Sequence, residues 1–185
     1  MTPLRSIATA ASTLCIALAC GGAQAQKVSF DTSALTVAPG ESFSLNLMAS
    51  EFTNAVLGGG FGLSFDPTVL RLDGVAVPAS WEFARNGGLI DNASGTLSDA
   101  YFATNSPVPG EVKLATLTFT ALNIGQSLIT PLASAPQPFV EDGAIEATVP
   151  SYQFATVTVA VPEPSSLALL LAGGLALTRL RSRRS

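Results

Sequence analysis

Histidine is absent from the 185 residues of this chain, and cysteine is limited to Cys15 and Cys20. Without histidine, the chain has no Ser-His or Cys-His catalytic pair and no histidine metal ligand. Charged residues make up only 12% of the sequence. The nine basic residues are too few and too dispersed to line a groove for nucleic acid, whose phosphates need Lys and Arg opposite them.

The charges that are present divide the chain into three parts. Five of the nine basic residues lie in the first and last twenty-five positions, whereas all thirteen acidic residues lie between Asp31 and Glu163. The segment from Gln26 to Pro164 therefore has four basic and thirteen acidic residues, a formal charge of −9. Its length is enough for one domain with its own core. We expect a single acidic domain between two apolar, basic ends.

Residues 1–25 have the pattern of a secretory signal peptide. Arg5 precedes an apolar run, and Ala23 and Ala25 form the small-x-small site that signal peptidase recognises. We expect cleavage before Gln26. A second interpretation is lipidation at Cys20, because residues 17–20 are close to a bacterial lipobox. Both cysteines lie in the predicted signal, so the exported domain would have no thiol and no disulfide.

The C-terminus, residues 161–185, combines three features in order. Pro162, Glu163 and Pro164 precede an apolar segment, Ser165–Leu180, and the chain closes with an arginine cluster: Arg179, Arg181, Arg183 and Arg184. As a helix the apolar segment would be about 24 Å long. That is slightly less than the ~30 Å hydrocarbon core, so we expect a short transmembrane helix whose arginines stay on the cytoplasmic side as a membrane stop.

This ending resembles the PEP-CTERM sorting signal of Gram-negative bacteria. The resemblance implies transient anchoring in the inner membrane and processing by an exosortase at Pro162-Glu163-Pro164. Release or transfer to the cell surface or extracellular matrix would follow. The family is commonly associated with exopolysaccharide production, as in a biofilm. A plain C-terminal membrane anchor is the alternative interpretation.

Residues 26–160 alternate apolar and polar side chains in short runs. The alternating apolar positions are Phe43, Leu45 and Leu47; Phe61, Leu63 and Phe65; Leu117 and Phe119; and Ala155, Val157, Val159 and Val161. Period two is typical of half-buried strands, and Gly/Pro turns separate the runs. The pattern predicts an all-β, antiparallel sandwich of about eight to nine strands. Between Val112 and Phe119 the apolar positions change from even to odd, which predicts a bulge near Ala115 or burial on both faces.

Three stretches in this part, residues 37–47, 60–70 and 113–121, together resemble the cohesin domain. The most specific is a strand that ends in Phe65-Asp66-Pro67 and returns to the core at Leu70. The resemblance implies a jelly roll that binds through a sheet face or loop rim and has no catalytic activity.

Two aromatic side chains are the candidate binding residues. Trp81 is the only tryptophan, and its ring would either stack on sugars or pack in the core. Tyr101 and Phe102 are adjacent, so one of them must face outward if the segment is extended. The sequence does not distinguish which.

The remaining chemistry favours structural interpretations. Carboxylates are scattered singly, so a glycoside hydrolase with paired carboxylates is a weak third hypothesis. The segment from Asp91 to Phe102 lacks the EF-hand spacing, and a hairpin explains it better than a calcium loop. We expect no catalytic residue, metal or cofactor.

The sequence therefore predicts an exported, non-catalytic interaction module. Its expected ligand is a protein partner, and an extracellular polysaccharide is the alternative. With only four basic residues in the domain, a neutral glycan is easier to accommodate than an acidic one.

Overall fold

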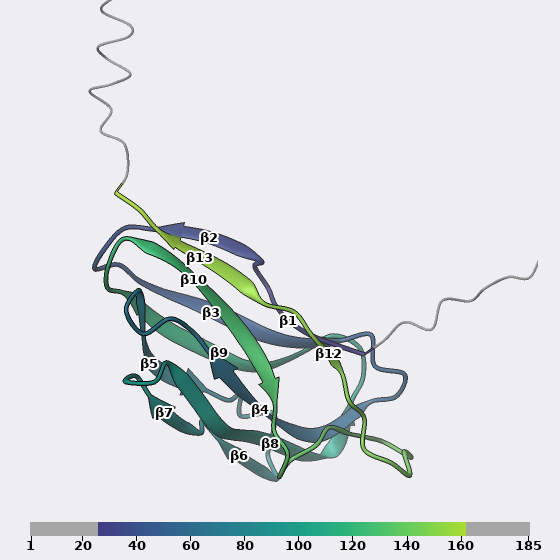
Figure 1. Ribbon diagram of the computed structural model, residues 1–185. Coiled ribbons are helices and arrows are strands. Elements are labelled where there is room, and N and C mark those ends of the chain that lie inside the picture. The colour runs from purple at the N-terminus through teal and green to yellow at the C-terminus, as the bar shows by residue number, and fades with distance from the viewer. Residues whose placement is uncertain (1–25, 162–185) are drawn as a thin grey trace, which may run out of the picture.

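The computed structural model describes residues 26–161, which form two facing β-sheets (Figure 1). The predictions for residues 1–25 and 162–185 lie outside this part of the chain. They include cleavage after Ala25, lipidation at Cys20, the Pro162-Glu163-Pro164 motif, the transmembrane helix and the four terminal arginines. Within residues 26–161, no helix has the length and apolarity needed to cross a membrane.

The first sheet has five strands in the order β12-β1-β3-β9-β5. Their bounds are β1 Lys27–Phe30, β3 Ser42–Ser50, β5 Leu70–Ala76, β9 Val112–Ala121 and β12 Ser151–Tyr152. The β3-β9 pair is the centre of this sheet, and Phe43 and Phe119 lie opposite each other with stacked rings 5.6 Å apart.

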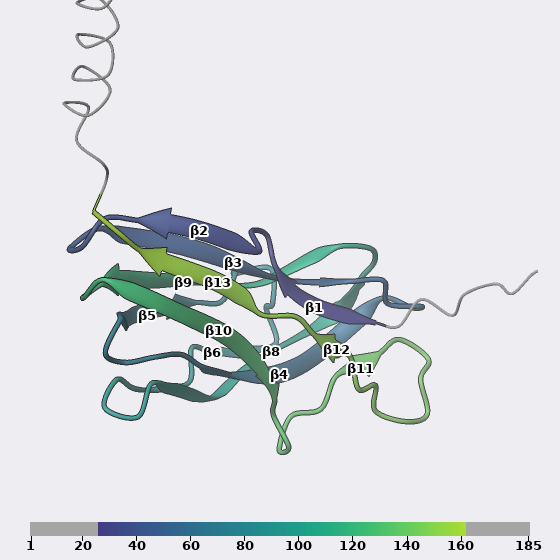
Figure 2. The ribbon, with the colours of Figure 1, turned by 45° about the horizontal axis from the view of Figure 1, so that its top comes forward.

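The second sheet has the order β2-β13-β10-β4-β8-β6, with β11 also paired to β4 and β7 to β8 (Figure 2). Its strands are β2 Ala34–Val37, β4 Val56–Ser64, β6 Ala84–Asn86, β7 Leu89–Asp91, β8 Thr96–Val108, β10 Gly125–Ala133, β11 Val140–Glu141 and β13 Ala155–Val159.

The sandwich was predicted correctly, but two details of the prediction were wrong. Both sheets are mixed, because β1 pairs with β12 and β13 pairs with β2 in parallel. The described residues contain thirteen strands rather than eight or nine. Several strands are only two to four residues long, too short for an alternating pattern to be recognised. The chain also passes from the first sheet to the second between Phe30 and Ala34, so β1 and β2 belong to different sheets.

The core lies between the sheets and is built from the alternating positions. Leu45, Leu47, Leu117 and Val157 are all buried, as the period-two pattern predicted. The bulge near Ala115 is confirmed. Leu47 pairs with Ala115 and Met48 with Lys113, so Leu114 is an extra residue, and both Leu114 and Ala115 are buried.

A buried carboxylate joins three separate segments at one end of the sandwich. Glu141 accepts hydrogen bonds from the Asn54 amide at 2.7 Å, the Thr148 hydroxyl at 2.7 Å and the Gln26 side chain at 3.5 Å. A buried charge needs such donors to offset its loss of water. Glu141 therefore holds the loop before β4 and the segment after β11 against the start of the domain.

Candidate binding groove

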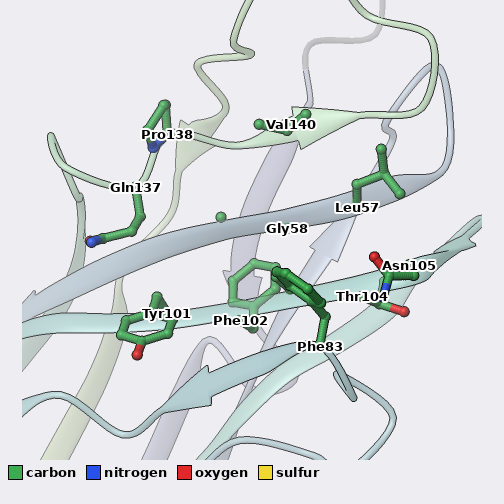
Figure 3. Close-up of a pocket in the computed structure, with 12 residues that line it drawn as sticks. Leu57, Gly58, Phe83, Tyr101, Phe102, Thr104, Asn105, Gln137, Pro138 and Val140 are labelled. Carbon is green, nitrogen blue, oxygen red and sulfur yellow. The ribbon is translucent and has the colours of Figure 1, made fainter.

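An open groove of about 520 Å³ lies on the outer face of the second sheet, over the paired strands β4 and β8. The pairing places Gly58 opposite Ala103 and Gly60 opposite Tyr101. Figure 3 shows Gly58 in the middle of the groove, with Pro138 and Val140 on one side and Phe83 on the other. We call this surface the β4-β8 groove.

The floor of the groove exists because β4 has glycine where other strands have side chains. A Cβ atom on Gly58 would lie 2.8 Å from the Phe102 carbonyl oxygen, and one on Gly60 would lie 2.7 Å from the Gln137 Cβ. Neither position has room for a side chain without movement of its neighbours. Glycine inside a strand commonly marks such a close approach, and here it keeps the groove open.

The walls of the groove are mainly apolar. Phe83 is 67% exposed and Val140 is 40% exposed, and Leu57, Tyr101 and Pro138 complete the apolar lining. Thr104, Asn105 and Gln137 provide polar groups at the rim. The lining includes no Asp, Glu, Lys or Arg. The groove can therefore bury apolar or aromatic groups, but it contains no carboxylate pair for acid-base chemistry.

The second wall comes from a segment far away in sequence. Residues 134–140 follow β10 and cross β4, where β11 pairs with Gly58 and Val56. The Ser134 hydroxyl donates to the Gln137 side chain at 2.9 Å, which helps to fix this segment. A smaller hollow of about 180 Å³, lined by Tyr152 and Val149 among others, lies on its other side.

Trp81 lies beneath the groove rather than in it. Its side chain is 0% exposed, its indole N–H donates to the Lys113 carbonyl at 3.1 Å, and its ring is 4.5 Å from Phe102. Phe102 in turn packs edge-on against Phe139, 5.5 Å away. Of the two interpretations of Trp81, core packing is correct and the exposed sugar-stacking ring is wrong, because the indole fills the space under β8.

Tyr101 and Phe102 are separated as an extended strand requires. Phe102 is buried in the core, while Tyr101 is half-buried and lines the groove. The structure therefore resolves which of the adjacent pair faces outward. Tyr101 therefore remains a candidate contact residue.

Glu82 holds the rim of the groove in place through hydrogen bonds to two rim residues. Its carboxylate accepts hydrogen bonds from the Thr104 hydroxyl at 2.6 Å and the Asn105 amide at 3.1 Å. The Thr104 hydroxyl bond lowers the pKa of Glu82 below its usual value of 4.5. At neutral pH the charged carboxylate therefore holds the end of β8 beside Phe83.

The segment from Asp91 to Gly95 is a turn, as the sequence predicted. The Asp91 carboxylate accepts hydrogen bonds from the Ala93 amide, the Ser94 amide and the Ser94 hydroxyl, and the Ser94 hydroxyl bond contributes most to lowering the pKa of Asp91. Gly95 has a positive φ of 69° and packs against the Phe65 carbonyl oxygen. No group of three or more acidic, His or Cys residues within 26–161 is arranged to hold a metal ion.

Asn92, in a formal glycosylation sequon, has a structural role in this turn. Its side-chain oxygen accepts from the Leu72 amide at 2.8 Å, and its amide donates to the Leu72 carbonyl at 3.0 Å. The side chain thus pairs with strand β5 as a neighbouring strand would. Both polar atoms of the Asn92 side chain are therefore bonded to the edge strand of the first sheet.

The outer face of the first sheet differs from the groove. Serine and threonine side chains of β3 and β9 pair across the strands: Ser42 with Thr120 and Ser44 with Thr118, both at 3.2 Å. The Thr116 hydroxyl donates to Asn46 at 2.8 Å. We call this surface the β3-β9 ladder. Its polar side chains bond to one another and to two neighbouring carboxylates, Asp31 and Asp73.

Sequence reasoning missed Leu57, Phe83, Pro138 and Val140 as groove residues. One local signal was available, the run of three glycines from Gly58 to Gly60 within an otherwise apolar strand. The wall formed by residues 134–140 had no such signal, because its place over β4 depends on contacts between distant parts of the chain.

Comparison with known proteins identifies the fold. No family model matches the sequence, and no curated protein matches it. Solved cohesin structures do match. The cohesin module of Clostridium acetobutylicum is 16% identical, with a TM-score of 0.56 over 76% of this chain and 95% of that chain. A non-cellulosomal cohesin from Archaeoglobus fulgidus is 13% identical, with a TM-score of 0.57 over 78% of this chain and 97% of that chain.

A third similar structure is the third ScaC cohesin of Acetivibrio cellulolyticus, solved in complex with the ScaB dockerin. It is 15% identical, with a TM-score of 0.57 over 74% of this chain and 99% of that chain. The described residues therefore have a cohesin-like fold, as the sequence resemblance implied.

Proposed function

We propose that this chain is an exported, non-catalytic interaction module that binds a protein partner through the β4-β8 groove. The observation that supports this most strongly is the groove itself. Exposed Phe83 and Val140 flank a glycine floor that has no room for side chains of its own. Such a surface buries an apolar side chain presented by a partner, and clustered apolar residues with a polar rim are common at protein interfaces.

The comparisons favour a protein ligand over other classes. One cohesin with the same fold was solved bound to a dockerin, so this fold supports protein recognition. The domain is acidic, with four basic and thirteen acidic residues from Gln26 to Pro164. We therefore expect a partner that inserts a bulky apolar side chain into the groove and has a neutral or basic surface around it.

A pull-down with residues 26–161 tests this proposal. We expect capture of a protein from envelope extracts, and about tenfold weaker binding by Phe83→Ala, because a buried aromatic contact is commonly a hot spot. Leu89→Ala is the matched control, since Leu89 is also an exposed apolar residue of this sheet but lies outside the groove. Equal capture by Phe83→Ala and Leu89→Ala would contradict the assignment of the groove.

Carbohydrate binding is the second candidate, favoured by the exposed ring of Phe83 beside Tyr101. Sugars stack on flat aromatic faces, whereas a protein side chain needs only apolar surface. Phe83→Leu separates the two: polysaccharide retention would be lost, but protein binding would be largely kept. The readouts are retention on immobilised extracellular polysaccharide and on the captured protein partner.

We further propose that export and sorting use the two ends of the chain. Signal peptidase would cut before Gln26, and an exosortase would process the chain at Pro162-Glu163-Pro164 before its transfer to the cell surface or matrix. The order of the proline motif, apolar segment and arginine cluster supports this. Intact-mass measurement of surface protein is the test: loss of Arg179–Ser185 is expected, and a mature mass that still includes Ser185 would contradict processing.

A further inference from the structure

The chain leaves the sandwich at the end opposite the groove. Val159 pairs with Gly125 at the start of β10, and the Ala160 amide donates to the Val37 carbonyl at 3.0 Å. Val161 therefore lies beside two turns, residues 38–41 and 122–124. Figures 1 and 2 both show the chain leaving beside the C-terminal ends of β2 and β13 and the start of β10. We call these two turns and Val161 the exit end.

The exit end is unusually apolar for a set of turns. Ile124 is 66% exposed, Val161 is 62% exposed and Leu122 is 37% exposed, and Pro39 is exposed beside them. The exit end contains no Lys or Arg. Its one acidic side chain, Glu41, accepts a hydrogen bond from the Ala38 amide of its own turn at 2.8 Å. Clustered exposed apolar residues of this kind mark contact surfaces.

Hydrogen bonds hold these apolar side chains in fixed positions. The Gly40 amide donates to the Ala121 carbonyl at 2.8 Å, and the Leu122 amide donates to the Val69 carbonyl at 2.8 Å. The Asn123 side chain donates to the Thr68 carbonyl at 2.7 Å. The turns are therefore tied to each other and to the turn before β5, so Leu122 and Ile124 project from a rigid base.

The length of chain beyond Val161 determines what can meet this end. Only three residues, Pro162 to Pro164, separate it from the apolar segment that begins at Ser165. Three residues span at most about 10 Å. While the apolar segment is in a membrane, the exit end is therefore held within about that distance of the bilayer surface, which raises its effective concentration at the interface.

We infer that the exit end is a membrane-facing surface, with Leu122, Ile124 and Val161 contacting the lipid interface while the chain is anchored. This inference rests on the proposed anchoring function. An apolar tip of this size enters the boundary between headgroups and acyl chains rather than spanning the bilayer. The occupant of this surface is the lipid of the anchoring membrane.

The inference also determines where the groove lies relative to the membrane. Strands β4 and β10 are antiparallel, so Gly58 lies near the end of the sandwich where β10 finishes, whereas Gly125 lies at the exit end. The length of β10 separates them by about 25 Å. In the anchored chain the β4-β8 groove therefore lies at the end of the sandwich distant from the membrane and stays accessible to a partner before the chain is processed.

Quenching by brominated lipid tests the orientation. The protein is the proposed exported chain, residues 26–185, which contains every strand of the described residues from β1 at Lys27 onward. It is reconstituted in phosphatidylcholine vesicles with brominated acyl chains. The reporter is Ile124→Trp, and the matched control is Ile145→Trp, a fully exposed position in the loop after β11. The parent chain corrects for buried Trp81.

We expect about threefold stronger quenching at position 124 than at position 145, because an interfacial contact places the ring at the acyl boundary. Leu122→Trp provides a second reporter if Ile124→Trp unfolds. Residues 26–161 alone should not float with vesicles. Flotation of 26–185 with equal quenching at 124 and 145 would overturn the orientation but leave the anchor intact. If 26–185 did not float, both the anchor and the orientation would be overturned.

Discussion

The outer faces of the two sheets carry different kinds of residue: polar side chains on the first sheet, and glycine flanked by apolar side chains on the second. On the β3-β9 ladder, Ser44 and Thr118 fill the surface and bind each other at 3.2 Å. On the second sheet, Gly58 leaves the surface empty, and Phe83 and Val140 surround the gap. The polar side chains of the ladder have hydrogen-bond partners within the domain, whereas the groove leaves apolar surface exposed. This difference is the reason why we propose the second sheet, and not the first, as the binding face.

The largest expected difference between the two faces concerns the buried aromatic rings that pack beneath them. Trp81→Ala removes a fully buried ring that packs on Phe102 beneath the groove. We expect a loss of about 3–5 kcal/mol in the free energy of unfolding, together with loss of partner binding. Phe43→Ala, a half-buried ring under the ladder, should lower stability less and keep binding. Urea denaturation and a binding assay measure both. Retained binding by Trp81→Ala at native stability would contradict the support role.

Gly58→Val should fill the groove from its floor. The new Cβ would lie 2.8 Å from the Phe102 carbonyl oxygen, so we expect a loss of stability of about 1–3 kcal/mol and roughly hundredfold weaker partner binding. Gly74→Val is the matched control, because a Cβ there meets nothing within 4 Å and β5 belongs to the other sheet. Isothermal titration of the partner into both variants measures the two affinities. Similar affinities would mean that the floor is not a contact surface.

A pH titration gives a smaller expected effect. The pKa of Glu82 is lowered by the Thr104 hydroxyl bond, so the stabilisation from this contact is present above the usual value of 4.5 and is lost as pH falls through the lowered pKa. Partner affinity should therefore weaken at acid pH as the rim loosens. The partner affinity of the Glu82→Gln variant should fall less between neutral and acid pH than the partner affinity of the parent chain. An identical pH profile for the two proteins would exclude Glu82 as the rim support.

Thr118→Val should have the smallest effect. It removes one exposed hydroxyl pair of the ladder, so we expect a change in stability within about 0.5 kcal/mol and unchanged partner binding. Thermal unfolding and the same binding assay measure it. A tenfold loss of affinity in this variant would move the binding face to the first sheet.

The longer strands could be predicted from the sequence because the alternation of apolar and polar residues arises within each strand. Alternation around Leu45, Leu117 and Val157 follows from one face of each strand packing on the core. The change of parity before Leu117 predicted a bulge near Ala115 or burial on both faces, and the bulge occurs at Leu114, since an extra residue shifts every later side chain to the other face.

The burial of Trp81 and the walls of the groove could not be predicted in this way. The ring of Trp81 packs against Phe102 of β8, and Phe102 in turn packs against Phe139, which lies far away in the sequence. Val140 reaches the groove only because β11 pairs with β4, more than seventy residues earlier in the chain. The burial of Trp81 and the position of Val140 both depend on contacts between distant parts of the chain, which no local sequence pattern indicates.

Hydrogen exchange with and without the captured partner tests the central claim most directly. The account predicts slower exchange on partner binding in residues 57–60 and 101–105, which form the floor and one edge of the β4-β8 groove. Residues 42–46 and 116–120 of the β3-β9 ladder should exchange as in the free domain. Protection of the ladder with an unchanged groove would contradict the account.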